Sequence, residues 1–235
     1  PAGKKFGSLN FYLLLCSAKY FKSVAMEQQN QPLEDIRIIK KIMEESSRFL
    51  SLSGLSGVAA GIFALAGAVA AHMIIPQDII NGEGYSESFR ASAEGSHIVR
   101  MLFADAAMVL LLALVSAFFF SWRKARKEGK SIWTPVTGRM LLNLALPLAA
   151  GGLFVIFTLG SVPGNVSASA TLIFYGLALI NSSKYTLGEI YWLGILEVVT
   201  GLATLLLPGH ALMLWAFGFG ILHIVYGLFM YIRYR

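Results

Sequence analysis

Two ionisable residues, Glu197 and His223, stand inside hydrophobic blocks of this chain and are the residues best able to do chemistry. An ionisable side chain at the centre of a membrane-spanning helix costs about 2.5–3.5 kcal/mol on insertion scales, so each is a candidate functional residue. A carboxyl that faces an imidazole in a low-dielectric medium can form an ion pair or a neutral hydrogen-bonded pair, and either form can relay a proton. The pair can also serve only to join two helices, because polar bonds between helices are common. Two ligands make no metal site, and we expect no metal or other cofactor.

The two residues lie in matching sequence frames, GILEVVTGL at 194–202 and GILHIVYGL at 220–228. Each frame has a glycine three residues before and four residues after the ionisable residue, and these positions share one helix face. At a rise of about 1.5 Å per residue, both residues lie about 15 Å from the outer ends of the last two predicted spans. Small residues let helix backbones approach closely. We therefore predict that these glycines bring the last two helices together and that Glu197 contacts His223 directly or through one water.

Asp105, Arg100 and Glu189 are secondary candidates. Asp105 lies seven residues into the second predicted span, so it needs an internal partner, and a structural contact is favoured over a solute pathway. Arg100 lies near the start of that span and can extend outward along its apolar stem. Glu189 begins the fifth predicted span near Lys184, where we expect a solvated, helix-capping role.

The composition shows which elements must hold these residues. Of 235 residues, 56% are apolar and 14% are charged, against about 25% charged in a typical soluble domain. A helix that crosses a bilayer needs about 20 mostly apolar residues. Six stretches qualify: 52–75, 98–122, 140–162, 166–182, 187–207 and 211–232. The sequence therefore predicts an all-α, polytopic membrane protein with six transmembrane helices.

The basic residues predict an orientation for these helices. All of the 19 lysines and arginines except Arg90 and Arg100 fall on one side of the predicted membrane. The positive-inside rule then places both termini in the cytoplasm, and we expect a bacterial cytoplasmic (inner) membrane. Pro76, Pro163 and Pro208 stand at the outer turns, where helices stop. The six helices are therefore expected to form three hairpins.

The chain before the first span predicts two further segments. Residues 26–50 include LEDIRIIKKIMEESSRFL, whose apolar residues recur near helical spacing, so we expect a cytoplasmic amphipathic helix there. Residues 1–25 precede the first methionine and form a candidate leader or non-native segment. The six-helix transmembrane domain then occupies residues 51–235. The single cysteine, Cys16, excludes a disulfide framework and zinc motifs that need paired cysteines.

Part of the chain resembles a known family. The stretch WLGILEVVTGLATLLLPGHALMLWAFGFGILHIVYGLF, residues 192–229, is similar to the glycine-punctuated hairpin of HdeD-like acid-resistance membrane proteins. That resemblance implies six spans and a role in acid stress, and it assigns no role to Glu197 or His223. The stretch QPLEDIRIIKKIMEESSRFLSLSGLSGVAAGIFALAGA resembles uncharacterised bacterial membrane proteins, which implies no biochemical activity.

Three classes of function follow. The chain lacks HExxH, GxSxG, P-loop and GxGxxG motifs, so a non-catalytic protein of envelope or acid stress is favoured over an intramembrane enzyme. A small proton-linked transporter or channel is the main alternative. The net charge of +6 forms no continuous patch, so we expect no nucleic-acid partner. The expected partner is the lipid bilayer, and a homo-oligomer, a solute or a protein partner remains open.

Overall fold

The computed structural model describes residues 54–76, 93–127, 129, 131–159 and 161–233, and these residues form helices and turns with no strand among them. The α-helices are α2 (Gly54–Ile74), α5 (Ala93–Lys127), α6 (Pro135–Thr158), α7 (Gly164–Ser182), α8 (Glu189–Leu206), α9 (Ala211–Trp215) and α10 (His223–Arg233). Short 3₁₀ turns, η1 (Ser183–Tyr185) and η2 (Pro208–His210), flank α8, and a π-helix, η3 (Ala216–Leu222), joins α9 to α10.

Six helices in the described part are long and apolar enough to cross a membrane, the last of them running without interruption through η2, α9, η3 and α10. For the described residues, the predictions of an all-helical fold and of six candidate spans are confirmed. The predicted segments 1–25 and 26–50 lie outside the described residues.

Local sequence explains where the observed helix ends differ from the predicted ones. Helix α5 runs 35 residues and carries basic side chains in its last turn, where they interact favourably with the helix dipole. Helix α6 begins at Pro135 rather than near residue 140. The Thr134 hydroxyl caps it by accepting a hydrogen bond from the Thr137 amide at 3.1 Å, and proline is favoured in the first turn. The predicted start rested on hydropathy, which does not detect a polar cap.

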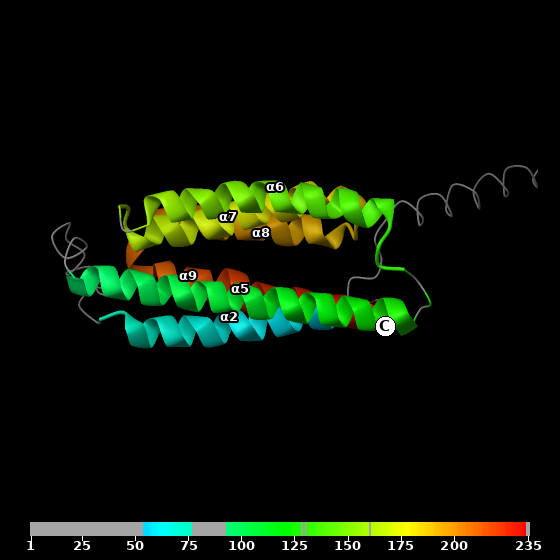
Figure 1. Cartoon of the computed structure of the whole chain (residues 1–235), viewed down its shortest axis with the longest axis horizontal. Helices are drawn as coiled ribbons and strands as arrows, with labels where there is room; N and C mark the ends of the chain where they lie inside the picture. The colour runs from blue at the N-terminus through cyan, green and yellow to red at the C-terminus, as the bar shows by residue number, and fades with distance from the viewer. Residues whose placement is uncertain (1–53, 77–92, 128, 130, 160, 234–235) are drawn as a thin grey trace, which may run out of the picture. The chain divides into compact units, whose positions relative to one another are not determined.

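Helices α7 and α8 form the centre of the bundle. In an apolar stretch of 18 residues from each of these helices, 39% of the residues are buried, against 6% in α5 and 11% in α6. Helix α7 packs along both α6 and α8, while α2 packs along α5 and α10 (Figure 1). The segment formed by α9 and η3 joins the two groups, because it contacts α2, α7 and α8. Helix α10 therefore packs along α2, and only the α9–η3 segment before it packs closely along α8.

Glycines allow close approach between α7 and α8 and between α2 and the last span. A side chain on Gly176 of α7 would meet the Gly194 carbonyl oxygen of α8 at 2.6 Å, and one on Gly194 would meet the Gly176 carbonyl oxygen at 2.7 Å. A side chain on Gly61 of α2 would meet the Gly220 carbonyl oxygen at 2.6 Å. Such backbone contact is what small residues permit where apolar helices pack.

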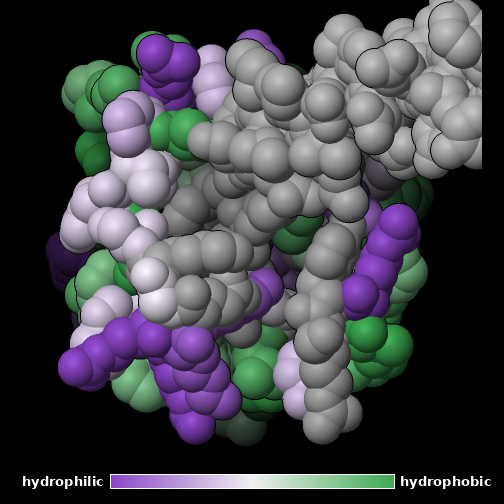
Figure 2. Space-filling view, turned by 90° about the vertical axis from the view of Figure 1, so that its right-hand side faces the viewer, coloured by the Kyte–Doolittle hydropathy of each residue, from purple (hydrophilic) through white to green (hydrophobic). Residues whose placement is uncertain are grey.

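Charged side chains gather at one end of the described helices. Figure 2 shows hydrophilic residues on this end beside the hydrophobic sides of the helices. The basic residues there include Lys124, Arg126 and Lys127 in the last turn of α5 and Arg233 in the last turn of α10. The Arg126 guanidinium lies 5.0 Å from the centre of the Trp122 ring, a geometry typical of cation–π contacts.

Candidate functional site

Glu197 lies near the middle of α8 and is completely buried. At about 1.5 Å per residue, the eight residues that separate it from Glu189 correspond to about 12 Å of helix. It shares the inward face of α8 with Thr200 and Thr204, whose hydroxyls donate to the carbonyls of Leu196 and Thr200 at 2.8 Å and 2.9 Å. These hydroxyls are therefore bonded to their own helix and leave the carboxylate without a donor from α8.

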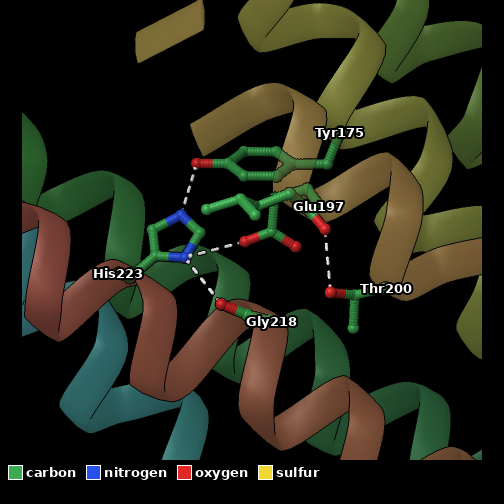
Figure 3. Close-up of polar contacts among 6 residues, drawn as sticks. Tyr175, Glu197, Thr200, Gly218 and His223 are labelled. Carbon is green, nitrogen blue, oxygen red and sulfur yellow. Dashed lines mark hydrogen bonds and ion pairs between the residues drawn. The ribbon is translucent and has the colours of Figure 1, made fainter. Parts of the chain in front are cut away.

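His223 lies where the π-helix η3 passes into α10, and its side chain is buried. Its Nδ1 lies 3.1 Å from the Gly218 carbonyl oxygen, and its Nε2 lies 2.7 Å from the Tyr175 hydroxyl of α7 (Figure 3). A π-helix shifts the backbone hydrogen-bond pattern and is often found at functional sites. Here it places the Gly218 carbonyl five residues before His223, within reach of the ring.

Glu197 and His223 contact one another directly. The Glu197 Oε1 atom lies 3.2 Å from His223 Nδ1, and their side chains are 0% and 7% exposed (Figure 3). Within the described residues, neither carboxylate oxygen of Glu197 has a hydrogen-bond partner of good geometry. The imidazole Nδ1 is therefore shared between a well-aligned backbone carbonyl and a nearby carboxylate.

The neighbours of His223 accommodate the ring in two protonation states. In the neutral form with hydrogen on Nδ1, the ring donates to the Gly218 carbonyl and accepts from the Tyr175 hydroxyl. In the imidazolium form both ring nitrogens donate, and the Glu197 carboxylate lies close enough to balance the charge. When the pair holds one proton, it is either a neutral carboxyl beside a neutral imidazole or a carboxylate beside an imidazolium. Both forms have no net charge.

Aromatic rings surround the imidazole. The Phe219 ring stacks on the His223 ring with centroids 6.0 Å apart, and the Tyr175 ring lies 5.3 Å from it. Trp215 continues the group, with its ring 5.0 Å from that of Phe219 and its Nε1 donating to the Thr171 hydroxyl at 3.2 Å. These rings replace water around the pair, so electrostatic interactions within it are stronger than at a surface.

The glycine frames do not act as the sequence suggested. Gly194 and Gly201 of α8 face α7, and Gly220 and Gly227 of α10 and its preceding π-helix face α2. The prediction that these glycines bring the last two helices together is wrong. Each frame instead fits its helix to a different neighbour, because backbone and side-chain atoms of α7 and of α2 occupy the spaces that the glycines leave. The glycine that does lie against the pair is Gly218, where an added Cβ would be 2.7 Å from Glu197 Oε2.

The secondary candidates lie apart from the pair. Glu189 at the start of α8 contacts Arg233 of α10, with Oε1 3.5 Å from the guanidinium Nη1, so it joins two helices as well as standing in a first turn. Asp105 of α5 is half-buried, and one of its oxygens lies near Gly67 of α2, 3.5 Å from where a Cβ would be. Arg100 is exposed. The described residues hold no group of three or more His, Cys, Asp or Glu side chains placed to bind a metal ion.

Tyr175 and Gly218 belong to the site, and sequence reasoning missed both. Tyr175 stands in TLIFYGLALIN, where Tyr175 and Thr171 carry the side-chain hydroxyls near mid-helix, and that position is a signal that could have marked Tyr175 as a candidate. Gly218 contributes a backbone carbonyl, and nothing in its sequence context marks a π-helix.

A lateral cleft lies between α8 and α10, on the side of the Glu197–His223 pair nearer to Glu189. It has a volume of about 750 Å³, and its walls include Trp192, Leu193, Leu222, Tyr226 and Phe229. Glu189 and Arg233 stand at its end. The cleft exists because α10 packs along α2 and diverges from α8.

Comparison of the chain with protein-family models, with curated proteins and with solved structures finds no match. The resemblance to HdeD-like proteins therefore stays a prediction.

Proposed function

We propose that this chain is a non-catalytic integral membrane protein that responds to acid through the Glu197–His223 pair. The observation that carries the proposal is a fully buried carboxylate whose nearest ionisable partner is an imidazole 3.2 Å away. Residues 164–232 contain one lysine or arginine, Lys184, and it is exposed near one end of the helices. His223 is therefore the group available to balance the charge of Glu197.

Proton balance links this pair to helix packing. With one proton shared between them, Glu197 and His223 have no net charge. A second proton leaves a positive charge in an apolar interior, and removal of the first leaves a negative one, each costing several kcal/mol when uncompensated. Because the pair joins α8 to the junction of η3 and α10, a change in its charge favours a rearrangement of α10 against α7 and α8.

The setting proposed for this device is a bacterial cytoplasmic membrane. The six helices would form three successive hairpins with both termini in the cytoplasm, preceded by the amphipathic helix of residues 26–50. Support comes from the one-sided distribution of basic residues and from the basic side chains gathered at the ends of α5 and α10. The acid-stress role implied by the HdeD-like resemblance of residues 192–229 agrees with a proton-responsive pair.

Infrared difference spectroscopy of the protein in liposomes tests this proposal. The buffer would be acidified across the ordinary titration range of glutamate and histidine side chains. We expect a carboxyl C=O band that disappears in Glu197→Gln and changes in His223→Leu. Glu189→Gln is the matched control, because Glu189 lies on the same helix but at its exposed end. A carboxyl band that survives in Glu197→Gln, with no change of amide signals on acidification, contradicts the proposal.

A small proton-linked transporter is the second candidate. The π-helix η3 changes the backbone hydrogen-bond pattern of the last span just before His223, and π-helical stretches within helices are frequent at functional sites. A pH-sensitive dye inside the liposomes separates the two functions. Proton entry that depends on Glu197 would favour transport, whereas a conformational response without proton entry favours the acid-responsive protein.

A further inference from the structure

The lateral cleft between α8 and α10 is large enough to hold part of a ligand. Its volume of about 750 Å³ lies within the range of about 300–1,000 Å³ typical of small-molecule sites. Its inner wall consists of Leu193 from α8 and Leu222 and Tyr226 from the last span, which pack on the core of the bundle. Its outer edges, Trp192 and Val225, are 68% and 59% exposed, so the cleft opens to the side of the helices.

Two contacts between ionisable side chains join the two helices that form the cleft. Glu197 and His223 meet at one level, and Glu189 and Arg233 meet near the helix ends. At about 1.5 Å per residue, the two levels are about 12–15 Å apart. The space between them is lined mainly by leucine, valine and aromatic side chains. This is a long apolar slot with a guanidinium at its end, on helices of membrane-spanning length and composition.

We propose that this cleft binds one acyl chain of an anionic glycerophospholipid, whose phosphate lies against Arg233. In a bilayer the occupant of an apolar side opening is a hydrocarbon chain, because water in it would lack hydrogen-bond partners. The Arg233 guanidinium is held at the edge of the cleft, 5.7 Å from the centre of the Phe229 ring, and its side chain is 57% exposed. A planar guanidinium with five N–H donors binds a carboxylate and a phosphate together. The basic last turn of α5 favours an anionic headgroup at this end of the helices.

Photo-crosslinking in vesicles tests the site. The protein would be reconstituted in phosphatidylcholine vesicles that contain phosphatidylglycerol with a photoactivatable diazirine in one acyl chain, and adducts would be mapped by peptide mass spectrometry. We expect adducts on the inner wall, at the buried Leu193 and the partly buried Leu222 and Tyr226. Lipid that only surrounds the protein would label exposed side chains instead, and adducts confined to those would overturn the proposal.

Two matched variants locate the acyl chain. Val225→Trp fills the cleft, whereas Val199→Trp adds the same bulk at a valine of similar exposure, 56% against 59%, that does not line it. Val225→Trp should lower the inner-wall yield severalfold, and Val199→Trp should leave it unchanged. Equal yields in the two variants overturn the site. Val225→Phe is the smaller replacement if circular dichroism shows that the tryptophan variant does not fold.

Arg233→Gln tests the headgroup. With the diazirine placed on phosphatidylglycerol or on phosphatidylcholine in parallel, the preference for the anionic lipid should fall about fivefold in this variant, the equivalent of the ~1 kcal/mol that one basic residue contributes near an anionic surface. An unchanged preference would overturn the role of Arg233. The readout involves no protonation of Glu197, so this proposal and the acid-responsive function can fail independently.

Discussion

Glu197 Oε1 on α8 lies 3.2 Å from His223 Nδ1 at the start of α10, although the glycines that flank these residues face two other helices. The contact is made through side chains from α8 and from the end of the π-helix, where the backbone turns His223 toward α7 and α8. The pair is therefore held by three helices, because Tyr175 of α7 completes the bonding of the imidazole.

The coupling between the two residues predicts non-additive losses of stability. His223→Leu leaves a buried carboxyl without its partner and should lower the free energy of unfolding in detergent by about 3–5 kcal/mol. Replacing both residues, as Glu197→Leu with His223→Leu, removes both groups and should cost less than the sum of the two single changes. Thermal melts of the single and double variants measure this coupling. Additive losses would mean that the pair contributes no interaction energy.

Tyr175→Phe removes the hydroxyl that bonds His223 Nε2 at 2.7 Å. The ring keeps its packing against Phe219, so the expected loss is that of one buried hydrogen bond with its partner left unsatisfied, about 1–3 kcal/mol. The matched control is Tyr191→Phe, whose ring is 42% exposed on α8 and which should change stability by less than about 0.5 kcal/mol. Chemical denaturation of both variants decides, and equal losses would contradict a specific role for the Tyr175 hydroxyl.

Gly218→Ala tests how tightly the backbone holds Glu197. The added Cβ would lie 2.7 Å from Glu197 Oε2 and 2.5 Å from Leu172 Cδ2, so both side chains or the helix must move. Overpacking of this kind typically costs about 1–3 kcal/mol. Gly152→Ala in α6 is the control, because nothing lies within 4 Å of its added Cβ and alanine is the better helix former, by up to about 1 kcal/mol. Melting temperatures should fall for Gly218→Ala and hold or rise for Gly152→Ala. A Gly218→Ala variant as stable as the wild type would show that the Glu197 and Leu172 side chains have room to move.

The proposed orientation predicts which side of the membrane holds the end of α5. Lys127 would be replaced by cysteine in a chain whose single native cysteine, Cys16, is replaced by serine. A membrane-impermeant thiol reagent should label this cysteine in inverted vesicles and leave it unlabelled in intact cells. Glu94→Cys, before the second predicted span, should behave in the opposite way. Labelling of the Lys127 position from outside intact cells would overturn the topology.

Sequence reasoning located the pair because its arguments there were local. Depth in a helix follows from residue count and rise, so residues at equal depth in neighbouring antiparallel helices can meet. Residue count and rise do not predict which helices pack against one another. A glycine shows that another backbone can approach it, but it does not show which one. By sequence Gly194 suits α7 or α10 equally, and the choice depends on the contacts of all six helices together. Glu189 was expected to be a solvated cap, and its contact with Arg233 depends on how α10 lies beside the start of α8.

The amino-acid sequence alone determined the six helices of the described residues that are long and apolar enough to cross a membrane, because the free energy of transfer from water depends on each residue and adds along a segment. It also determined that Glu197 and His223 lie deep within two of them. The tertiary structure decided that Tyr175 and the Gly218 carbonyl complete the site, that the glycine frames serve α7 and α2, and that α8 and α10 diverge to leave a cleft. The physical reason is that helix pairing and the π-helical hydrogen-bond shift depend on contacts among segments distant in the chain.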